Sequence, residues 1–174
     1  WSCLPDIYGG PPFGRTKQEC WEGFRIGPDG SWDANSDRRS AFEGQRFPID
    51  AFDSFVHQTV PRWTVNDAPT QTAYDRLVAR VGPAVVMAHS QAGNFAFTAA
   101  LHAPEKVRAV IGVEPSGTPT PDQVDVTRVR DIPHLVLWGD YVDASPRWTG
   151  YKARIDAYGD ALRAAGGSLD IIDL

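Results

Sequence analysis

Short apolar runs alternate along this chain with longer segments of helical periodicity. The runs cover residues 83–88, 106–113, 134–138 and 167–174, and helical spacing recurs over residues 67–80, 94–101 and 150–165. Short, nearly uninterrupted apolar runs are typical of strands that are covered on both faces. The alternating order predicts an α/β fold with a largely parallel sheet flanked by helices. Residues 1–8 are compatible with a further strand.

The first apolar run leads directly into Ser90. Ala88 and Ala92 lie two residues before and after this serine, and Gly93 follows. Small residues at these places permit the sharp strand-to-helix turn of a nucleophile elbow, here with alanines where glycines are commoner. Such a turn exposes the serine hydroxyl, and the backbone N–H of Gln91 is then available to stabilise an oxyanion. The alternative is a serine that only caps the next helix.

An acidic side chain, Glu114, stands at the end of the next predicted strand. After a right-handed crossover this strand lies beside the strand that leads to Ser90, and the carboxyl ends of parallel strands gather catalytic groups. We therefore expect Glu114 near Ser90, placed to orient a histidine rather than to attack substrate. The alternative is a solvated carboxylate at a strand end.

These residues carry a resemblance to a known family. The sequence AHSQAG at residues 88–93, followed by GVEPSG at 112–117, resembles the α/β-hydrolase superfamily and in particular a group of bacterial secreted esterases. The residues around 24–28, 47–48, 137–141 and 146–148 are similar to other parts of that group. The resemblance implies that Ser90 is the nucleophile, that Glu114 orients the base, and that Gln91 supplies one oxyanion donor. It also implies a small-molecule ester substrate and an acyl-enzyme intermediate.

Two features of the family have no counterpart in this sequence. Family members carry the catalytic histidine in a loop after the last strands, and here the chain ends with the strand predicted at 167–174. The glycine turn that gives a second oxyanion donor is also lacking. We therefore expect a single, partial α/β-hydrolase domain over residues 1–174, since such enzymes usually need about 250 residues. The histidine is expected outside this segment, and a second chain or fragment is one source.

None of the four histidines in the sequence is assigned as the base. His89 adjoins Ser90, but consecutive residues of a strand point to opposite faces. His57 belongs to a predicted amphipathic helix, His102 to a helix end, and His134 to the start of a strand. A chain without a base leaves a second interpretation open, namely a catalytically silent α/β-hydrolase-like binding or structural protein.

Asp143, with Asp140 before it, is the alternative acid. Many α/β-hydrolases place the acid after the strand that corresponds here to residues 134–138. Both aspartates also suit a turn rich in loop-forming residues, which is the interpretation we favour. Glu114 remains the predicted acid because both its spacing and its strand-end position fit.

Residues 27–66 are rich in Gly, Pro, Asp, Ser and Trp and show little periodicity before Asp50. A loop of this length is more often functional than not, which predicts a cap-like insertion ahead of Ser90. Aromatic side chains in and near it are candidates for a substrate pocket, or equally for the insertion's own core: Trp32, Phe47, Phe52, Trp63 and Trp148.

The composition narrows the function further. The net charge of −5 and the lack of a basic cluster argue against a nucleic-acid partner, and no apolar run approaches the roughly 20 residues of a membrane span. No glycine-rich phosphate loop and no metal-ligand spacing occurs, so we expect neither a cofactor nor a metal. Cys3 and Cys20 could close a disulfide. Together with the resemblance, this favours a periplasmic or secreted protein.

Overall fold

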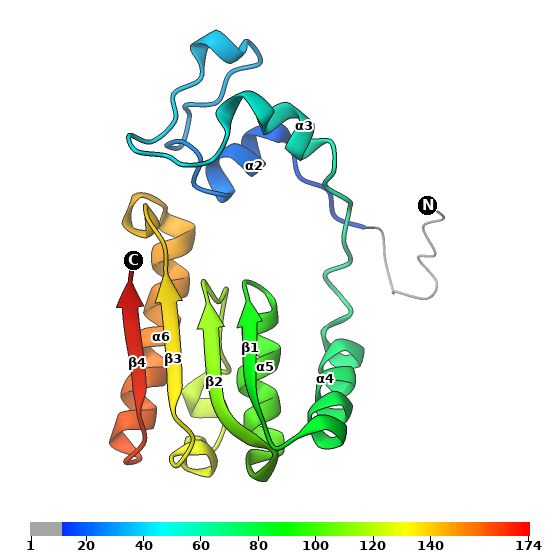
Figure 1. The fold of residues 1–174 in the computed structure, drawn as a ribbon, viewed down its shortest axis with the longest axis vertical. Helices are drawn as coiled ribbons and strands as arrows, with labels where there is room; N and C mark the ends of the chain where they lie inside the picture. Colours follow the sequence, from blue (N-terminus) through cyan, green and yellow to red (C-terminus); the bar gives the residue numbers. More distant parts are fainter. Residues whose placement is uncertain (1–11) are drawn as a thin grey trace. The chain divides into compact units, whose positions relative to one another are not determined.

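The computed structural model describes residues 12–174 and contains a four-stranded parallel sheet (Figure 1). Its strands lie side by side in sequence order, and every neighbouring pair is parallel. The strands are β1 (Ala84–His89), β2 (Val107–Val113), β3 (His134–Trp138) and β4 (Leu169–Asp173). The predicted α/β fold is therefore confirmed, whereas the strand considered at residues 1–8 lies outside the described residues.

The three long helices also follow the predicted pattern. They are α4 (Asp67–Val81), which leads into β1, α5 (Ala92–His102) between β1 and β2, and α6 (Pro146–Ala164) before β4. Figure 1 shows α5 and α6 on the same side of the sheet. Between β2 and β3 the chain forms two short 3₁₀ helices, Pro121–Gln123 and Val126–Val129. The other 3₁₀ helices of the described residues are Ser36–Arg38, Ile49–Ala51, Pro104–Lys106 and Val142–Ala144.

One face of the sheet is buried beneath these helices. Val110, Val136 and Trp138 of the strands are fully buried, as is Phe97 of α5. Phe97 also stacks on the ring of His134 at a centroid distance of 5.6 Å. Removing this apolar area from water is the main contribution to the stability of the sheet.

The opposite face differs from the sequence expectation. Val85 and Met87 of β1 are 56% and 67% exposed, and Ile172 of β4 is 46% exposed. Among the described residues this face of β1 is therefore not covered, contrary to the expectation that both faces of the strand are buried. Apolar character shows that a strand is suited to burial, but it does not tell which segment covers it.

The chain divides into two compact units. One consists of the described residues up to Asp67 together with Tyr141–Arg147, and the other of Ala68–Asp140 with Trp148–Leu174. We call them the insertion unit and the sheet unit. The insertion unit contains two short helices, α2 (Lys17–Gly23) and α3 (Phe52–Val56).

The insertion unit has an aromatic core of its own. Trp21 and Phe52 are fully buried, and their rings meet edge to face at 4.9 Å, a favourable geometry for aromatic pairs. The indole N–H of Trp21 donates to Ser31 Oγ at 2.9 Å. Cys20 belongs to the same buried cluster, while Cys3, its predicted disulfide partner, lies outside the described residues.

A buried arginine joins two parts of the insertion unit. The side chain of Arg39 is only 5% exposed and donates to Asp53 Oδ2 at 3.0 Å. Its guanidinium also lies over the rings of Trp32 and Phe52. The hydrogen bond from Lys17, followed by that from Arg39, lowers the pKa of Asp53 below its usual value. Charged pairs and cation–π contacts thus hold together a unit that has little regular secondary structure.

Candidate active site

Ser90 lies on a sharp turn between a strand and a helix. Strand β1 ends at His89, Ser90 has a left-handed backbone with φ of 56°, and α5 begins at Ala92. Gln91 stands at the N-terminal end of α5 with φ of −58°. The backbone N–H groups and the dipole at such a helix end favour negative charge. The predicted strand–turn–helix geometry is therefore present around the serine.

Backbone hydrogen bonds join this turn to the one that follows β2. The N–H of Ser90 donates to the carbonyl of Val113, and the N–H of Ser116 donates to the carbonyl of Ser90, both at 3.0 Å. The N–H of Gly93 donates to the same Ser90 carbonyl at 3.0 Å. The position of Ser90 is consequently fixed by the turn that contains Glu114.

Gly93 allows the two turns to approach closely. A Cβ atom at this position would lie 2.5 Å from Cβ and 3.1 Å from Cα of Pro115. These distances leave no room for a side chain unless the backbone moves. A glycine three residues after Ser90 is thus a packing requirement set by Pro115.

Glu114 occupies the position that the sequence predicted, directly after β2. The register pairs His89 with Val113, so Ser90 and Glu114 follow paired residues of neighbouring strands, which lie about 5 Å apart. The backbone of Glu114 is left-handed, with φ of 45°. Its N–H donates to the carbonyl of Leu137 at 2.8 Å, and its Oε1 accepts the backbone N–H of Gly139 at 3.0 Å. The carboxylate is therefore held at the end of β3.

Left-handed residues other than glycine include the two strand-end residues of this site. Among residues 12–174 they are Arg25, Ser90, Glu114 and Tyr141. Of these, Ser90 follows β1 and Glu114 follows β2. Such conformations are unfavourable for side chains with a Cβ and gather at functional sites. Their positions favour the carboxyl edge of the sheet as the site of chemistry.

Three of the four histidines lie in the sheet unit. His89 is the last residue of β1 and is exposed. His102 ends α5, where its Nδ1 lies 2.8 Å from Asp75 Oδ2. His134 begins β3 at the opposite edge of the sheet, and burial lowers its pKa below the usual 6.5. His57 belongs to the insertion unit, where it caps α3, so the helix predicted around it is shorter than expected.

The alternative acids lie in more exposed surroundings than Glu114. Asp140 and Asp143 are exposed, and Asp143 belongs to the 3₁₀ turn Val142–Ala144. Glu114, by contrast, is half-buried and accepts a backbone hydrogen bond. This comparison favours Glu114 as the group that orients a base.

The aromatic residues considered for a pocket have packing roles. Phe52 is part of the insertion core, and Trp32 and Phe47 pack against that core. Trp148 belongs to the sheet unit, where it meets Trp138 edge to face at 6.3 Å. Trp63 is half-buried. The core interpretation therefore accounts for at least Trp32, Phe47 and Phe52.

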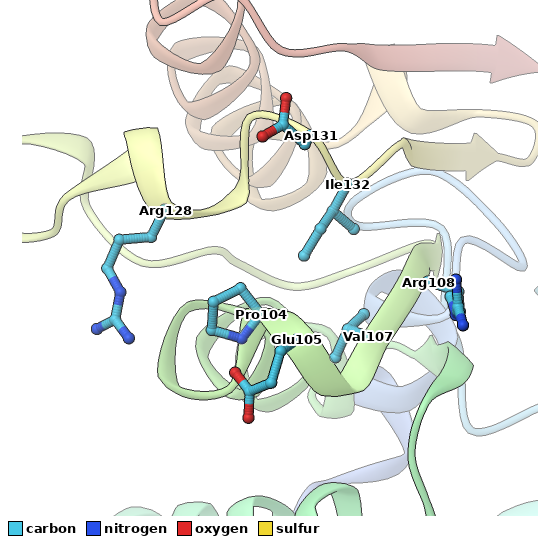
Figure 2. A pocket seen from close by; sticks show the side chains of 7 residues that line it. All are labelled: Pro104, Glu105, Val107, Arg108, Arg128, Asp131 and Ile132. Atoms are coloured by element: carbon cyan, nitrogen blue, oxygen red, sulfur yellow. The ribbon is translucent and has the colours of Figure 1, made fainter.

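A pocket of about 480 Å³ lies away from this edge, near the start of β2. Figure 2 shows that Arg108 and Arg128 extend to opposite sides of it, and that the apolar side chains of Ile132 and Val107 lie between them. Its polar groups do not converge on one point, as a specific ligand site requires. We therefore assign this pocket no part in the chemistry.

Metal clusters and membrane-spanning helices are both absent from residues 12–174. Over residues 12–174, His, Cys, Asp and Glu side chains form no group of three or more that could hold a metal ion. In the same part of the chain, no helix has both the length and the apolar character needed to cross a membrane.

Sequence reasoning missed Gly139 in this region, and it did not foresee the left-handed backbone of Tyr141 in the loop that follows. Gly139 contributes a backbone N–H to the bond with Glu114. Every residue except proline has such a group, so the identity of residue 139 could not predict this hydrogen bond. Tyr141 is left-handed and hydrogen-bonded at its hydroxyl. Its place in the sequence GDY, directly after a strand, indicated a turn and nothing more.

Comparisons with known proteins find similarity to esterases and to a lipase. A family described as "Putative esterase" matches residues 23–166. The structure of a novel bacterial esterase superimposes with a TM-score of 0.78 at 30% sequence identity, covering 98% of this chain and 54% of that one. "Probable secreted lipase phiG" of Fungal sp. (strain ATCC 74256) is 31% identical over 71 residues, which are 41% of this chain and 20% of the lipase.

The chain thus spans 54% of the length of the bacterial esterase and 20% of the lipase. The family match covers most of the chain, including the elbow and the strand that ends at Glu114. On this evidence, the chain belongs to the esterase family and has the α/β-hydrolase fold.

Proposed function

We propose that this chain is the nucleophile-bearing part of a serine carboxylic-ester hydrolase that works through an acyl-enzyme. The observation that carries the proposal is the pairing of two strained strand-end residues, Ser90 and Glu114, on neighbouring parallel strands. Membership of the esterase family supports the ester substrate. The histidine that completes the triad comes from outside this segment, in the same protein or in a partner chain.

The proposed reaction begins with the hydroxyl of Ser90. Its oxygen attacks the carbonyl carbon of the ester while the imidazole accepts its proton. Glu114 orients the imidazole and stabilises the positive charge that forms on it. The backbone N–H of Gln91, at the N-terminus of α5, stabilises the oxyanion. The C–O bond to the alcohol then breaks, and the imidazolium gives its proton to the leaving oxygen.

A water molecule completes the cycle. The imidazole accepts a proton from this water as the water oxygen attacks the acyl carbon. The bond to Ser90 Oγ breaks, and the serine regains its proton from the imidazolium. The products are a carboxylic acid and an alcohol, so no oxidant, reductant or cofactor is needed.

We also propose that the protein is exported. The bacterial esterases that the chain resembles are secreted proteins, and the name of the lipase relative also describes it as secreted. Fractionation of the source cells, with detection of this chain in the medium or periplasm, tests the proposal. Recovery from the cytoplasm alone contradicts it.

The test of the reaction is substitution in the intact protein. We expect Ser90→Ala to lower kcat for a short p-nitrophenyl ester by about 10³-fold or more, and Glu114→Gln by about 10³-fold. Asp143→Asn, the matched control on the alternative acid, leaves kcat unchanged. Full activity of the Ser90→Ala protein excludes the mechanism, and a large loss with Asp143→Asn but not with Glu114→Gln reassigns the acid.

A fluorophosphonate probe distinguishes this enzyme from a silent relative. The probe phosphonylates a serine only when a base activates it. We expect Ser90 to be labelled in the intact protein and the label to be absent from Ser90→Ala. An intact protein that stays unlabelled supports a binding or structural function instead.

A further inference from the structure

The carboxylate of Glu114 takes the place of a main-chain acceptor between β2 and β3. The N–H of Glu114 donates to the carbonyl of Leu137 at 2.8 Å. If the parallel ladder continued, the N–H of Gly139 would next donate to the main-chain carbonyl of residue 114. Strand β2 has ended at Val113 and Glu114 is left-handed, and the N–H of Gly139 donates to Oε1 of Glu114 instead, at 3.0 Å. The side chain thus forms the last hydrogen bond between these two strands.

The peptide group that makes this bond is also held by β4. The N–H of Leu174 donates to the carbonyl of Trp138 at 2.9 Å, next to the register pair of Trp138 with Asp173. A trans peptide is planar, so the carbonyl of Trp138 and the N–H of Gly139 point in opposite directions and turn together. Strand β4 therefore fixes the direction in which the N–H of Gly139 points at the carboxylate.

Helix α6 holds both partners of this arrangement. Lys152 Nζ lies 2.9 Å from Asp173 Oδ1, which attaches the carboxyl end of β4 to the helix. The side chain of Trp138 is fully buried and meets Trp148 of α6 edge to face at 6.3 Å. All these residues belong to the sheet unit, as Glu114 does. The chain of contacts from α6 to the acid thus lies within one unit.

We propose that Leu174 is a positioning residue for Glu114 and acts through its main-chain N–H. By holding the carbonyl of Trp138, it keeps the N–H of Gly139 directed at the carboxylate, and this carboxylate then orients the histidine. The side chain of Leu174 is 77% exposed, so the role requires only the main chain. The inference rests on the functions proposed above for Ser90 and Glu114.

The first test compares two substitutions of Leu174 in the intact protein. Proline has no N–H and removes the bond to Trp138, whereas alanine keeps it. The preceding residue, Asp173, lies in a strand, the backbone shape that a following proline favours. We expect Leu174→Pro to slow phosphonylation of Ser90 by a fluorophosphonate about tenfold, as for the loss of one hydrogen bond. Leu174→Ala should leave this rate unchanged.

A double-mutant cycle shows whether the effect passes through the acid. In a Glu114→Gln background, Leu174→Pro should alter the phosphonylation rate less than about twofold, because the carboxylate is already absent. With Glu114 present, Leu174→Pro should move the acid limb of the pH profile for phosphonylation to lower pH. A poorly held carboxylate stabilises the imidazolium less, so the pKa of the histidine falls.

A second pair of variants leaves the backbone unchanged. Lys152→Met removes the ion pair at the carboxyl end of β4, and we expect phosphonylation to slow about two- to threefold, since exposed ion pairs are weak. The acid limb should move in the same direction as in Leu174→Pro. Arg163→Met is the matched control on α6, because Arg163 donates to the carbonyl of Leu169 at the amino end of β4, at 3.0 Å. It should leave both the rate and the pH profile unchanged.

The outcomes separate this inference from the proposed function. Equal slowing by Leu174→Pro in both backgrounds, no slowing in either, or an unmoved acid limb overturns the positioning role while Ser90 and Glu114 keep theirs. If the Leu174→Pro protein does not fold, Lys152→Met decides, and an unchanged rate and profile there overturn the role. If Glu114→Gln itself leaves the rate unchanged, the assignment of the acid fails first, and the inference fails with it.

Discussion

The two compact units of this chain are stabilised in different ways. In the sheet unit, backbone ladders and apolar side chains repeat with a regular period, as in the register that pairs Val110 with His134. In the insertion unit, the helices are short and individual side chains supply the order, with Trp21 and Arg39 each making several specific contacts. The comparison teaches that a repeating pattern specifies the sheet, whereas single residues specify the insertion.

The largest effect is expected from a substitution that creates a cavity in the core of the sheet unit. Phe97 is fully buried, and its ring meets both His134 and Tyr158. We expect Phe97→Ala to lower the free energy of unfolding by about 3–5 kcal/mol, measured by urea titration with far-UV circular dichroism. Phe97→Leu, which keeps most of the volume, should cost less than half as much. A small loss with Phe97→Ala would mean that the sheet does not depend on regular core packing.

An equally buried aromatic residue in the insertion unit should give a more local effect. Trp21→Ala removes the ring contact with Phe52 and the bond to Ser31. We expect a local loss of about 3 kcal/mol, seen as faster amide hydrogen exchange within residues 12–66. The amides of β2 and β3 should remain protected. Equal loss of protection in β2 and β3 would show that the two units unfold together.

A smaller effect is expected from an added methyl group in the insertion unit. A Cβ atom on Gly27 would lie 2.3 Å from the Ser40 carbonyl oxygen and 2.3 Å from Trp21 Nε1. We expect Gly27→Ala to destabilise the protein by about 1–3 kcal/mol. Gly150→Ala is the matched control in the sheet unit, because that glycine lies in α6 with open space around it. Gly150→Ala should raise the free energy of unfolding by about 0.5–1 kcal/mol. Thermal unfolding of both variants measures the two changes.

The smallest effect depends on pH. Burial lowers the pKa of His134 below its usual 6.5, so at lower pH the unfolded chain binds a proton that the folded chain resists. The contribution of neutral His134 to the free energy of unfolding is therefore fully present above about pH 6.5 and decreases as the pH falls below that value. His134→Asn keeps a donor near the carbonyl of Ile132 and should flatten this dependence. If the free energy of unfolding of His134→Asn, measured by urea titration, changes between pH 7 and 5 as much as that of the unaltered protein, the role of His134 is contradicted.

The sequence predicted most of the sheet unit because periodicity and turn chemistry act locally. The strands, the helices and the strand-end positions of Ser90 and Glu114 all follow from short windows. The exposed face of β1 did not follow, since burial of Val85 and Met87 depends on what lies against them. The helical spacing of residues 67–80 predicted α4 but not the depth to which its side chains are buried, because Val78 is buried whereas Leu77 is 59% exposed.

The insertion unit and the loop after β3 were much less predictable. Residues 27–66 showed little period, and their order comes from pairs such as Arg39 with Asp53 that are distant in sequence. The contact of Tyr141 with Glu43 spans 98 residues. The hydrogen bond to Glu114 comes from a main-chain group. No local pattern encodes such pairings, so the sequence could indicate the acid but not what holds it.

The close approach of Gly93 to Pro115 has a consequence for the redesign of this protein. The two positions are coupled, because a side chain at position 93 would meet the Cβ atom of residue 115, which every residue except glycine has. A library that varies position 93 alone is expected to yield misfolded clones, because every side chain there meets residue 115. Randomising both codons together gives access to shapes of this corner that stepwise evolution would pass over.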